Sequence, residues 1–189
     1  MEVVDLSRPL CGAARPGHFR GVATVVTKLL LATRPHLAVF GHKDHQQLAV
    51  VRRLVRDLCL DVEVVGVPTV REPDGLALSS RNVHLGPETR RQARVLVRAL
   101  RAAQAAGSGG EQRRDVLLAL VEREIAKAPL ARLDYAELRD PDTLEPAPSR
   151  LSGPTLLALA VRFPCGEGRT VRLIDNCVLH PRAAEEEGT

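Results

Sequence analysis

The sequence predicts an α/β fold, in which a parallel sheet covered by helices is followed by a smaller α+β C-terminal part. Two short apolar runs, residues 37–40 and 62–67, alternate with two amphipathic stretches, residues 19–33 and 44–58. Strands that are apolar on both faces are typical of a parallel sheet buried between helices. After residue 87 the order changes to two helical stretches followed by three strand-like runs, which indicates the α+β part.

The two amphipathic stretches predict helices because their apolar residues recur three and four positions apart, on one face of a helix. Pro35 ends the first helix, since proline cannot continue it. The apolar positions are Val22, Val25, Val26, Leu29 and Leu30 in the first helix and Leu48, Val51, Val55 and Leu58 in the second.

A stretch without periodicity separates the two parts of the chain. Residues 68–82 read PTVREPDGLALSSRN, and the prolines, the glycine and the polar residues predict a loop and a domain boundary there. We therefore expect one domain over residues 1–69 and a second over residues 70–182. The acidic tail, residues 183–189, is expected to be disordered.

In the second domain, a helix is predicted from Pro87 to about residue 106, because proline is favoured at the first helical position. The glycine-rich residues 107–110 predict a turn, and residues 112–128 predict another helix. The runs LARLDYAELRD, TLLALAVRF and TVRLID predict three strands. One face of the first helix carries arginines, which we interpret as a solvated face; they are Arg90, Arg94, Arg98 and Arg101.

The composition narrows the class of protein. The 189 residues are 44% apolar and 26% charged, which is typical of a globular protein. The net charge of +4 fits an anionic small substrate, whereas a nucleic-acid-binding domain would also need stacking aromatics. Because there is only one Tyr, three Phe and no Trp, we expect no nucleic-acid partner.

Neither a membrane nor a disulfide framework is predicted. No apolar run approaches the length of a membrane span, and residues 1–10 do not read as a secretory leader, so we expect a cytoplasmic protein. The cysteines contain no C-x-x-C pair, and we expect them to be reduced and mostly buried. They are Cys11, Cys59, Cys165 and Cys177.

The first candidate site is the segment FGHKDHQQ at residues 40–47, where a strand ends and a helix begins. Helix N-termini at this edge of a parallel sheet bind anions, and Lys43 adds a positive charge. The alternative is that Asp44 and Gln47 form a capping arrangement that serves only stability. His42 and His45 also form an H-x-x-H pair, but two ligands are too few for a metal, and we predict none.

Two further segments offer anion donors. Leu78-Ser79-Ser80-Arg81 combines two hydroxyls and a guanidinium in a loop that could close over a ligand, although the same residues also suit a simple turn. Arg15, in the polar turn before the first helix, could reach a carboxylate or phosphate, or could be merely solvent-exposed.

Together these segments resemble one known family. RPGHFRGVATVVTKLL, FGHKDHQQL, VGVPTVREPDGLALSSRN and the late RLIDN occur in the order and spacing of pantothenate synthetases, and the resemblance covers residues 4–176. It implies a Rossmann-like sheet of the nucleotidyltransferase type over residues 1–69 and a lid domain over residues 70–182. It also implies a cytoplasmic homodimer that joins pantoate to β-alanine at the expense of Mg-ATP, through pantoyl adenylate.

The resemblance also assigns roles to individual residues. Lys43 and Arg81 would be catalytic, through charge stabilisation at the phosphates. Gln47 would hold pantoate, and Arg15 and His18 would lie near the substrate and dimer region. The residues implied to bind ATP are Gly41, His42, Lys43, Asp44, Val70, Leu78, Ser79, Ser80 and Arg81.

The chain departs from the family pattern in several places. His42 replaces the usual glutamate, His45 the usual tyrosine and Leu78 the usual methionine. The family's N-terminal half, with its histidine-containing H-x-G-H loop and central strands, is not found in these residues. We therefore expect an apolar sheet edge to be exposed. The alternative function is a catalytically incompetent remnant that acts at most as a nucleotide-binding or dimerisation fragment.

Overall fold

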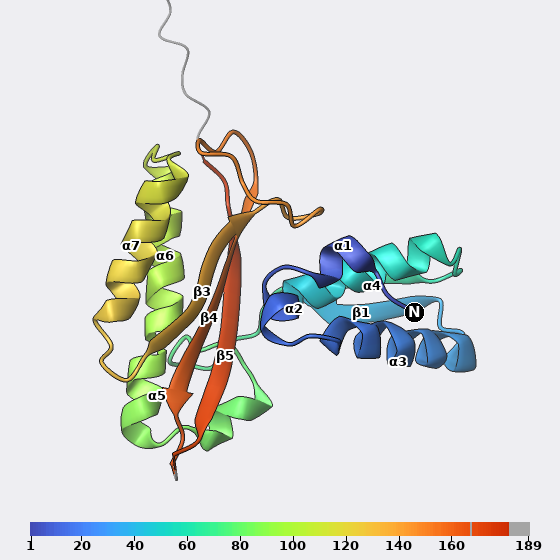
Figure 1. Cartoon of the computed structure of the whole chain (residues 1–189), viewed down its shortest axis with the longest axis horizontal. Coiled ribbons are helices and arrows are strands. Elements are labelled where there is room, and N and C mark those ends of the chain that lie inside the picture. The colour runs from blue at the N-terminus through green and yellow to red at the C-terminus, as the bar shows by residue number, and fades with distance from the viewer. Residues whose placement is uncertain (167, 182–189) are drawn as a thin grey trace, which may run out of the picture. The chain divides into compact units, whose positions relative to one another are not determined.

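The structure is a computed structural model that describes residues 1–166 and 168–181. The chain forms two compact units. The first contains Met1–Thr69 and Asp142–Leu144, and the second contains Val70–Pro141 and the residues from Glu145 onward. A two-stranded parallel sheet in the first unit and a three-stranded antiparallel sheet in the second confirm the predicted α/β class (Figure 1). The tail predicted to be disordered lies outside the described residues.

The first unit is built from short N-terminal helices and a β-α-β core. Strand β1 pairs in parallel with β2, with Leu37 opposite Glu63 and Gly41 opposite Val67. In chain order the elements are α1 (Val4–Ser7), α2 (Cys11–Ala14), α3 (His18–Thr33), β1 (Leu37–Gly41), η1 (His42–Asp44), α4 (His45–Asp57) and β2 (Glu63–Val67).

The helices of the first unit follow the predicted periodicity, with one correction. Leu48, Val51 and Leu54 of α4 are buried as a stripe. In α3 the buried stripe is formed by Phe19, Ala23, Thr27 and Leu30, whereas Val25 and Leu29 are exposed, so the predicted apolar face is rotated. Helix α3 packs against α4.

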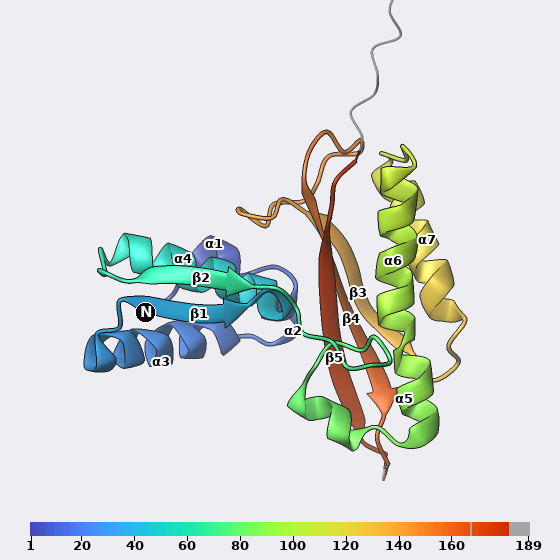
Figure 2. The same cartoon turned by 180° about the vertical axis from the view of Figure 1, so that it is seen from behind.

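The sheet of the first unit is apolar but not fully covered. Helix α4 packs on both strands, and Figure 2 shows the sheet from the side away from this helix. Leu37 is 50% exposed and Val39 is 55% exposed, and side chains two residues apart share one face of a strand. The expectation that β1 is buried on both faces is therefore wrong.

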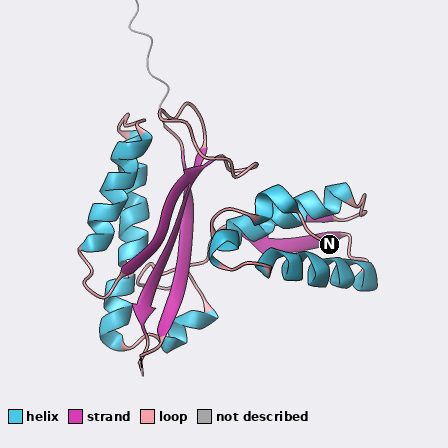
Figure 3. Cartoon of the chain, viewed as in Figure 1, coloured by secondary structure: helices cyan, strands magenta, loops and turns pink. Residues whose placement is uncertain are grey.

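In the second unit, helices cover one face of an antiparallel sheet of order β3-β4-β5 (Figure 3). Helices α6 and α7 pack against each other, and their apolar faces form one core with the sheet. In chain order the elements are η2 (Ser80–His84), α5 (Pro87–Ala93), α6 (Val95–Ser108), α7 (Arg114–Ala126), β3 (Arg132–Arg139), β4 (Thr155–Pro164) and β5 (Thr170–Leu179).

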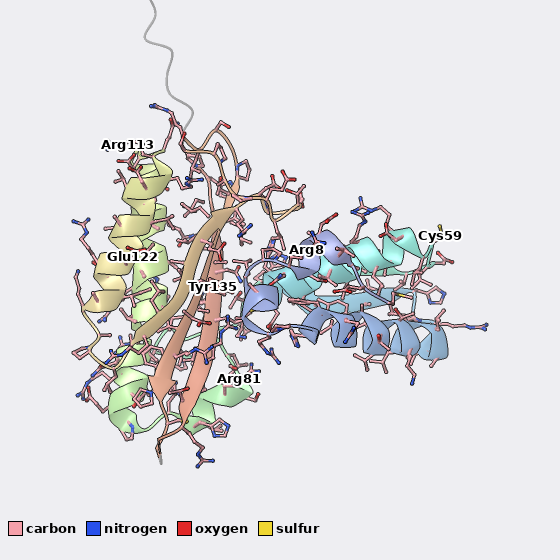
Figure 4. All side chains as sticks on the ribbon, in the orientation of Figure 1. Arg8, Cys59, Arg81, Arg113, Glu122 and Tyr135 are labelled. Atoms are coloured by element: carbon pink, nitrogen blue, oxygen red, sulfur yellow. The ribbon has the colours of Figure 1, made fainter. Side chains whose placement is uncertain are left out.

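Two predictions about this unit need correction. The single helix predicted from Pro87 is broken at Arg94 into α5 and α6, and α6 runs through Ser108 into the predicted turn. Only Cys11 of the four cysteines is buried; Cys59 is exposed, as Figure 4 shows, and the other two are partly exposed. All four are free thiols, as expected. Within the described residues, no helix is both long and apolar enough to cross a membrane.

Candidate functional site

The predicted site residues fall into two groups, one in each unit. The first group, residues 41–47, lies where β1 ends and the chain turns through η1 into α4. Lys43 is partly buried, with its side chain 13% exposed, and its Nζ lies 3.5 Å from Asp44 Oδ2. The carboxylate of Asp44 is 50% exposed. A lysine held beside the start of a helix presents positive charge to an anion at this edge of the sheet.

Asp44 does not act as the predicted helix cap. It occupies the N-cap position of α4, but its side chain accepts no capping hydrogen bond from the helix. The alternative in which Asp44 and Gln47 serve only as a capping pair is therefore wrong. The Asp44 carboxylate is instead a charged neighbour of Lys43, directly before α4.

His42, which replaces the family's glutamate, lies against the neighbouring strand. A Cβ atom added to Gly66 of β2 would be 2.3 Å from His42 Nε2 and 2.9 Å from a methyl group of Leu48. The absence of a side chain at position 66 is what lets the imidazole lie over β2. The ring thus fills space at the strand end, next to Lys43.

The neighbouring glutamines have different surroundings. Gln46 is buried; its Oε1 accepts a hydrogen bond from Cys11 N at 3.0 Å, and its Nε2 donates to Leu6 O at 2.9 Å and Pro9 O at 2.7 Å. It therefore fastens the N-terminal helices to α4. Gln47, the predicted pantoate ligand, is only partly buried. The role of Gln46 was not predicted, because its partners lie 35 to 40 positions earlier in the chain.

The remaining candidates of the first unit lie at the start of α3 and beside the H-x-x-H pair. Arg15 Nη1 is 3.3 Å from His18 Nε2, and the His18 ring lies 4.9 Å from that of Phe19. His42 and His45 are both partly buried. Across residues 1–166 and 168–181, no group of three His, Cys, Asp or Glu side chains could hold a metal ion.

The second group begins with a β-hairpin, where a loop was predicted. Arg71 and Ala77 form an antiparallel bridge, Glu72 N donates to Leu76 O at 2.8 Å, and Leu78 N donates to Val70 O at 2.9 Å.

The turn closes through Gly75, whose φ of +90° suits glycine. We call residues 70–78 the hairpin. Val70 and Leu78, which the resemblance implies bind ATP, are exposed at its open end.

A buried ion pair ties the hairpin to β5. Arg71 Nη1 and Nη2 donate to Asp175 Oδ2 at 2.6 Å and Oδ1 at 3.0 Å. The Asp175 side chain is 2% exposed and the Arg71 side chain 27%. The hydrogen bonds to Asp175 raise the pKa of Arg71 above its ordinary value. Burial raises the pKa of the nearby Cys177 thiol to about 12, with the Asp175 charge adding to the effect, so this thiol stays protonated.

A second charged network ties the hairpin to α5. Arg90 hydrogen-bonds Glu72, and its Nε donates to Asp74 Oδ2 at 3.0 Å. Asn82 Nδ2 donates to Glu72 Oε1 at 2.6 Å. The hydrogen bonds from Asn82 and Arg90 lower the pKa of Glu72. Burial opposes ionisation of Asp74, but the Leu76 amide and Arg90 outweigh it, so its pKa is also lowered.

Beyond the hairpin, Ser79 is the N-cap of η2, and Ser80 and Arg81 are its first two residues; we call residues 79–81 the 79–81 turn. Ser79 Oγ accepts a hydrogen bond from Arg81 N at 3.2 Å. Ser80 and Arg81 are exposed, and Figure 4 shows Arg81 on the second unit. Three donor side chains therefore lie together on a short exposed segment with a fixed base, an arrangement that can bind phosphate oxygens.

Sequence reasoning missed the residues that hold this segment in place. Arg71, Glu72 and Asn82 stood in the quoted motif but received no role, and Arg90 was interpreted as part of a solvated face. The correction for Arg90 follows from its two carboxylate partners, whereas Arg94, Arg98 and Arg101 are exposed as expected. Asp175 had a signal, because a carboxylate within an apolar strand needs a partner.

The chain matches a known protein family. The family model described as pantoate-beta-alanine ligase matches residues 1–178. The pantothenate synthetase of Syntrophobacter fumaroxidans is 53% identical over 183 residues, which are 97% of this chain and 62% of the relative. That of Geobacter sulfurreducens is 52% identical over 179 residues, which are 95% of this chain and 61% of the relative.

Solved structures give the same result. The crystal structure of the pantothenate synthetase from Thermus thermophilus has a TM-score of 0.89 and 49% identity, over 96% of this chain and 63% of that one. The Francisella tularensis pantoate-beta-alanine ligase, complexed with beta-gamma ATP and beta-alanine, has a TM-score of 0.65 and 29% identity, over 94% and 57%. The chain thus spans about three-fifths of its relatives' length, and it belongs to the pantoate–β-alanine ligase family.

Proposed function

We propose that the chain takes part in the ATP-dependent condensation of pantoate with β-alanine to pantothenate. The observation that carries this proposal is the position of Lys43, partly buried where β1 ends and α4 begins, in a chain that matches the ligase family over residues 1–178. The solved relative complexed with an ATP compound and β-alanine supports the same substrates.

The proposed reaction has two steps. A carboxylate oxygen of pantoate attacks the α-phosphorus of ATP, and the bond to the β-phosphate oxygen breaks, so that pyrophosphate leaves. The amine of β-alanine then attacks the acyl carbon of pantoyl adenylate, AMP leaves with the electrons of the broken bond, and the amine loses its proton. Neither step needs a covalent enzyme nucleophile; both need aligned reactants and stabilised negative charge.

In this proposal, Lys43 and Arg81 stabilise the charge that develops on the phosphates. Ser79 and Ser80 donate hydrogen bonds to phosphate oxygens, and Gln47 holds pantoate. The residues around the nucleotide are Gly41, His42, Asp44, Val70 and Leu78. The first domain, residues 1–69, would form the base of the nucleotide site, and the second, residues 70–182, would act as a lid.

Mg²⁺ would enter with the phosphates of ATP. Magnesium usually keeps several waters and binds one or two carboxylates together with substrate phosphates, so it needs no cage of protein ligands. Asp44, exposed beside Lys43, suits that limited role. The ion would neutralise part of the phosphate charge when bound.

We further propose a cytoplasmic homodimer, which the resemblance to the family implies. Sedimentation equilibrium at micromolar concentration tests the assembly, and a mass of one chain, 20.5 kDa, would contradict the dimer.

Pantoate-dependent exchange of labelled pyrophosphate into ATP tests the activity. We expect exchange only with pantoate present, and we expect Lys43→Met to slow it about a hundredfold, the usual cost of losing one preorganised donor. Lys28→Met, which removes an exposed lysine of α3, is the control and should leave the rate unchanged.

The alternative function is a catalytically incompetent remnant that acts at most as a nucleotide-binding or dimerisation fragment. Absence of exchange at saturating substrates, together with retained ATP binding, would support that function. It would contradict the ligase proposal for this chain alone.

A further inference from the structure

Asn82 directly follows the 79–81 turn and is buried, with 5% of the residue exposed. Its Nδ2 donates to Glu72 Oε1 at 2.6 Å and to Ala77 O at 3.0 Å. The two acceptors belong to opposite strands of the hairpin, since Arg71 and Ala77 face each other across it. The side-chain amide of Asn82, one residue after Arg81, therefore hydrogen-bonds to both strands of the hairpin.

The main chain of Asn82 closes the turn as well. Asn82 N donates to Ser79 O at 3.0 Å, and Leu85 N donates to Asn82 O at 3.1 Å. On the other side of the turn, Leu78 N donates to Val70 O at 2.9 Å. The 79–81 turn is thus fixed to the hairpin at both of its ends.

The Glu72 side chain is itself held by a contact with α5. Arg90 of α5 hydrogen-bonds both Glu72 and Asp74, and Asp74 Oδ1 accepts a bond from Leu76 N at 3.2 Å. Charge-assisted hydrogen bonds are stronger than neutral ones. The bond from Arg90 therefore holds the Glu72 carboxylate in place as an acceptor for Asn82. The chain of contacts runs from α5 through Glu72 to Asn82 and the turn.

We propose that Asn82 and Glu72 are positioning residues, which hold the 79–81 turn in a shape that presents its donors to an anionic ligand. Neither residue needs to touch the ligand. The ordering of the turn is completed during folding, so binding does not have to supply it. The inference rests on the proposed function in one respect, because it takes ATP phosphates as the ligand of Ser79, Ser80 and Arg81.

Amide hydrogen exchange tests the positioning role without any ligand. In Asn82→Ala we expect the amides of residue 82 and of Leu85 to exchange about tenfold faster or more, since two side-chain hydrogen bonds are lost. The amides of α6 should keep their rates.

Glu72→Ala should have the same effect, and Glu72→Gln, which keeps an oxygen acceptor for Asn82, should restore most of the protection. Glu88→Gln, in the exposed Glu88–Arg91 pair of α5, is the matched control and should change nothing.

Calorimetric titration with ATP provides the second readout. We expect Asn82→Ala to weaken ATP binding about tenfold, with Glu88→Gln equal to wild type. Unchanged exchange at the turn in Asn82→Ala would overturn the inference, as would a uniform rise in exchange that includes α6. So would faster exchange at the turn with unaltered ATP affinity. If the wild-type chain takes up no ATP, the proposed function fails, and the exchange rates alone decide whether Asn82 positions the turn.

Discussion

At the scale of single residues, the pair of Arg71 and Asp175 shows how burial decides the worth of a charge. Both terminal nitrogens of the Arg71 guanidinium donate to the Asp175 carboxylate, and the Asp175 side chain is 2% exposed. Removing one member of a buried pair strands the other charge in a poorly solvated position. On α4, Arg53 also contacts both oxygens of Asp57, but there both side chains are well exposed.

We predict that Arg71→Ala destabilises the second unit by about 3 kcal/mol, whereas Arg53→Ala costs about 0.5 kcal/mol. Urea unfolding followed by tyrosine fluorescence checks the first value, because Tyr135 of β3 is the chain's single tyrosine and there is no tryptophan. Circular dichroism measures the second. Equal losses in the two variants would show that burial does not distinguish these pairs.

The sequence allowed some of these residues to be predicted but not others. Lys43, Ser79 and Arg81 stand in compact motifs, so the roles that we propose for them could be inferred from the sequence. The partner of Arg71 lies 104 positions away, and only the folded sheet brings Asp175 to it. The role of Gln46 likewise depends on where Leu6 and Pro9 fold back.

At the scale of elements, the hairpin is the feature that positions the 79–81 turn. Gly75 adopts φ +90°, a conformation that other L-residues reach only with strain. We predict that Gly75→Ala destabilises the second unit by about 1–2 kcal/mol, measured by urea unfolding of Tyr135 fluorescence. Gly86→Ala is the control, because Gly86 has φ −65° and open space around its Cα. A shift in Gly86→Ala as large as that in Gly75→Ala would contradict this account of the turn.

The hairpin also predicts an acid-sensitive contribution to stability. The folded pKa values of Glu72 and Asp74 lie below their ordinary values of 4.5 and 3.8. Groups with a depressed folded pKa stabilise the fold fully above the unfolded pKa, and this contribution is lost as the pH falls through the folded pKa. We therefore expect stability to be level from pH 7 to about 5 and to fall below pH 4.5.

The effect can be assigned to this network by comparison with Glu72→Gln. Thermal melts between pH 6 and pH 2 should show a shallower acid loss in this variant, because one of the two titrating carboxylates is gone. An identical pH profile in both proteins would place the acid sensitivity elsewhere, for example at Glu111, whose pKa its hydrogen bonds with Arg113 lower to about 2.

Elements themselves were largely predictable from periodicity, and the exceptions have physical reasons. The hairpin was predicted as a loop because its residues lack alternation and are held by charged side chains and Asn82 instead. The break between α5 and α6 falls at Arg94, where no proline or glycine marks it. The buried stripe of α3 uses Ala23 and Thr27 rather than the larger Val25 and Leu29, which depends on the packing partner.

At the scale of the whole molecule, the chain divides near the boundary between Thr69 and Val70, with Asp142–Leu144 assigned to the first unit. The second unit has its own core, built from α6, α7 and the sheet. We predict that residues 70–181, carrying Leu144→Ser to remove an apolar side chain that is buried in the intact chain, fold alone. A cooperative urea transition of Tyr135 fluorescence would show this, and a featureless transition would contradict it.

The boundary between Thr69 and Val70 lies in a stretch, residues 68–75, that contains two prolines and a glycine. The assignment of residues 142–144 to the first unit could not be predicted, because it depends on contacts between positions distant in the sequence. The exposed apolar face of β1, with Leu37 and Val39, was not predicted, because a strand that is apolar on both faces reads as one buried between two layers.

We propose that this chain carries phosphate-binding residues of the ligase family, with Lys43 among them. Isothermal titration of ATP with Mg²⁺ into the purified chain tests this claim most directly. The account predicts saturable binding that Lys43→Met weakens about tenfold or more and that Lys28→Met leaves unchanged. Absence of binding, or equal affinities in the wild type and Lys43→Met, would contradict it.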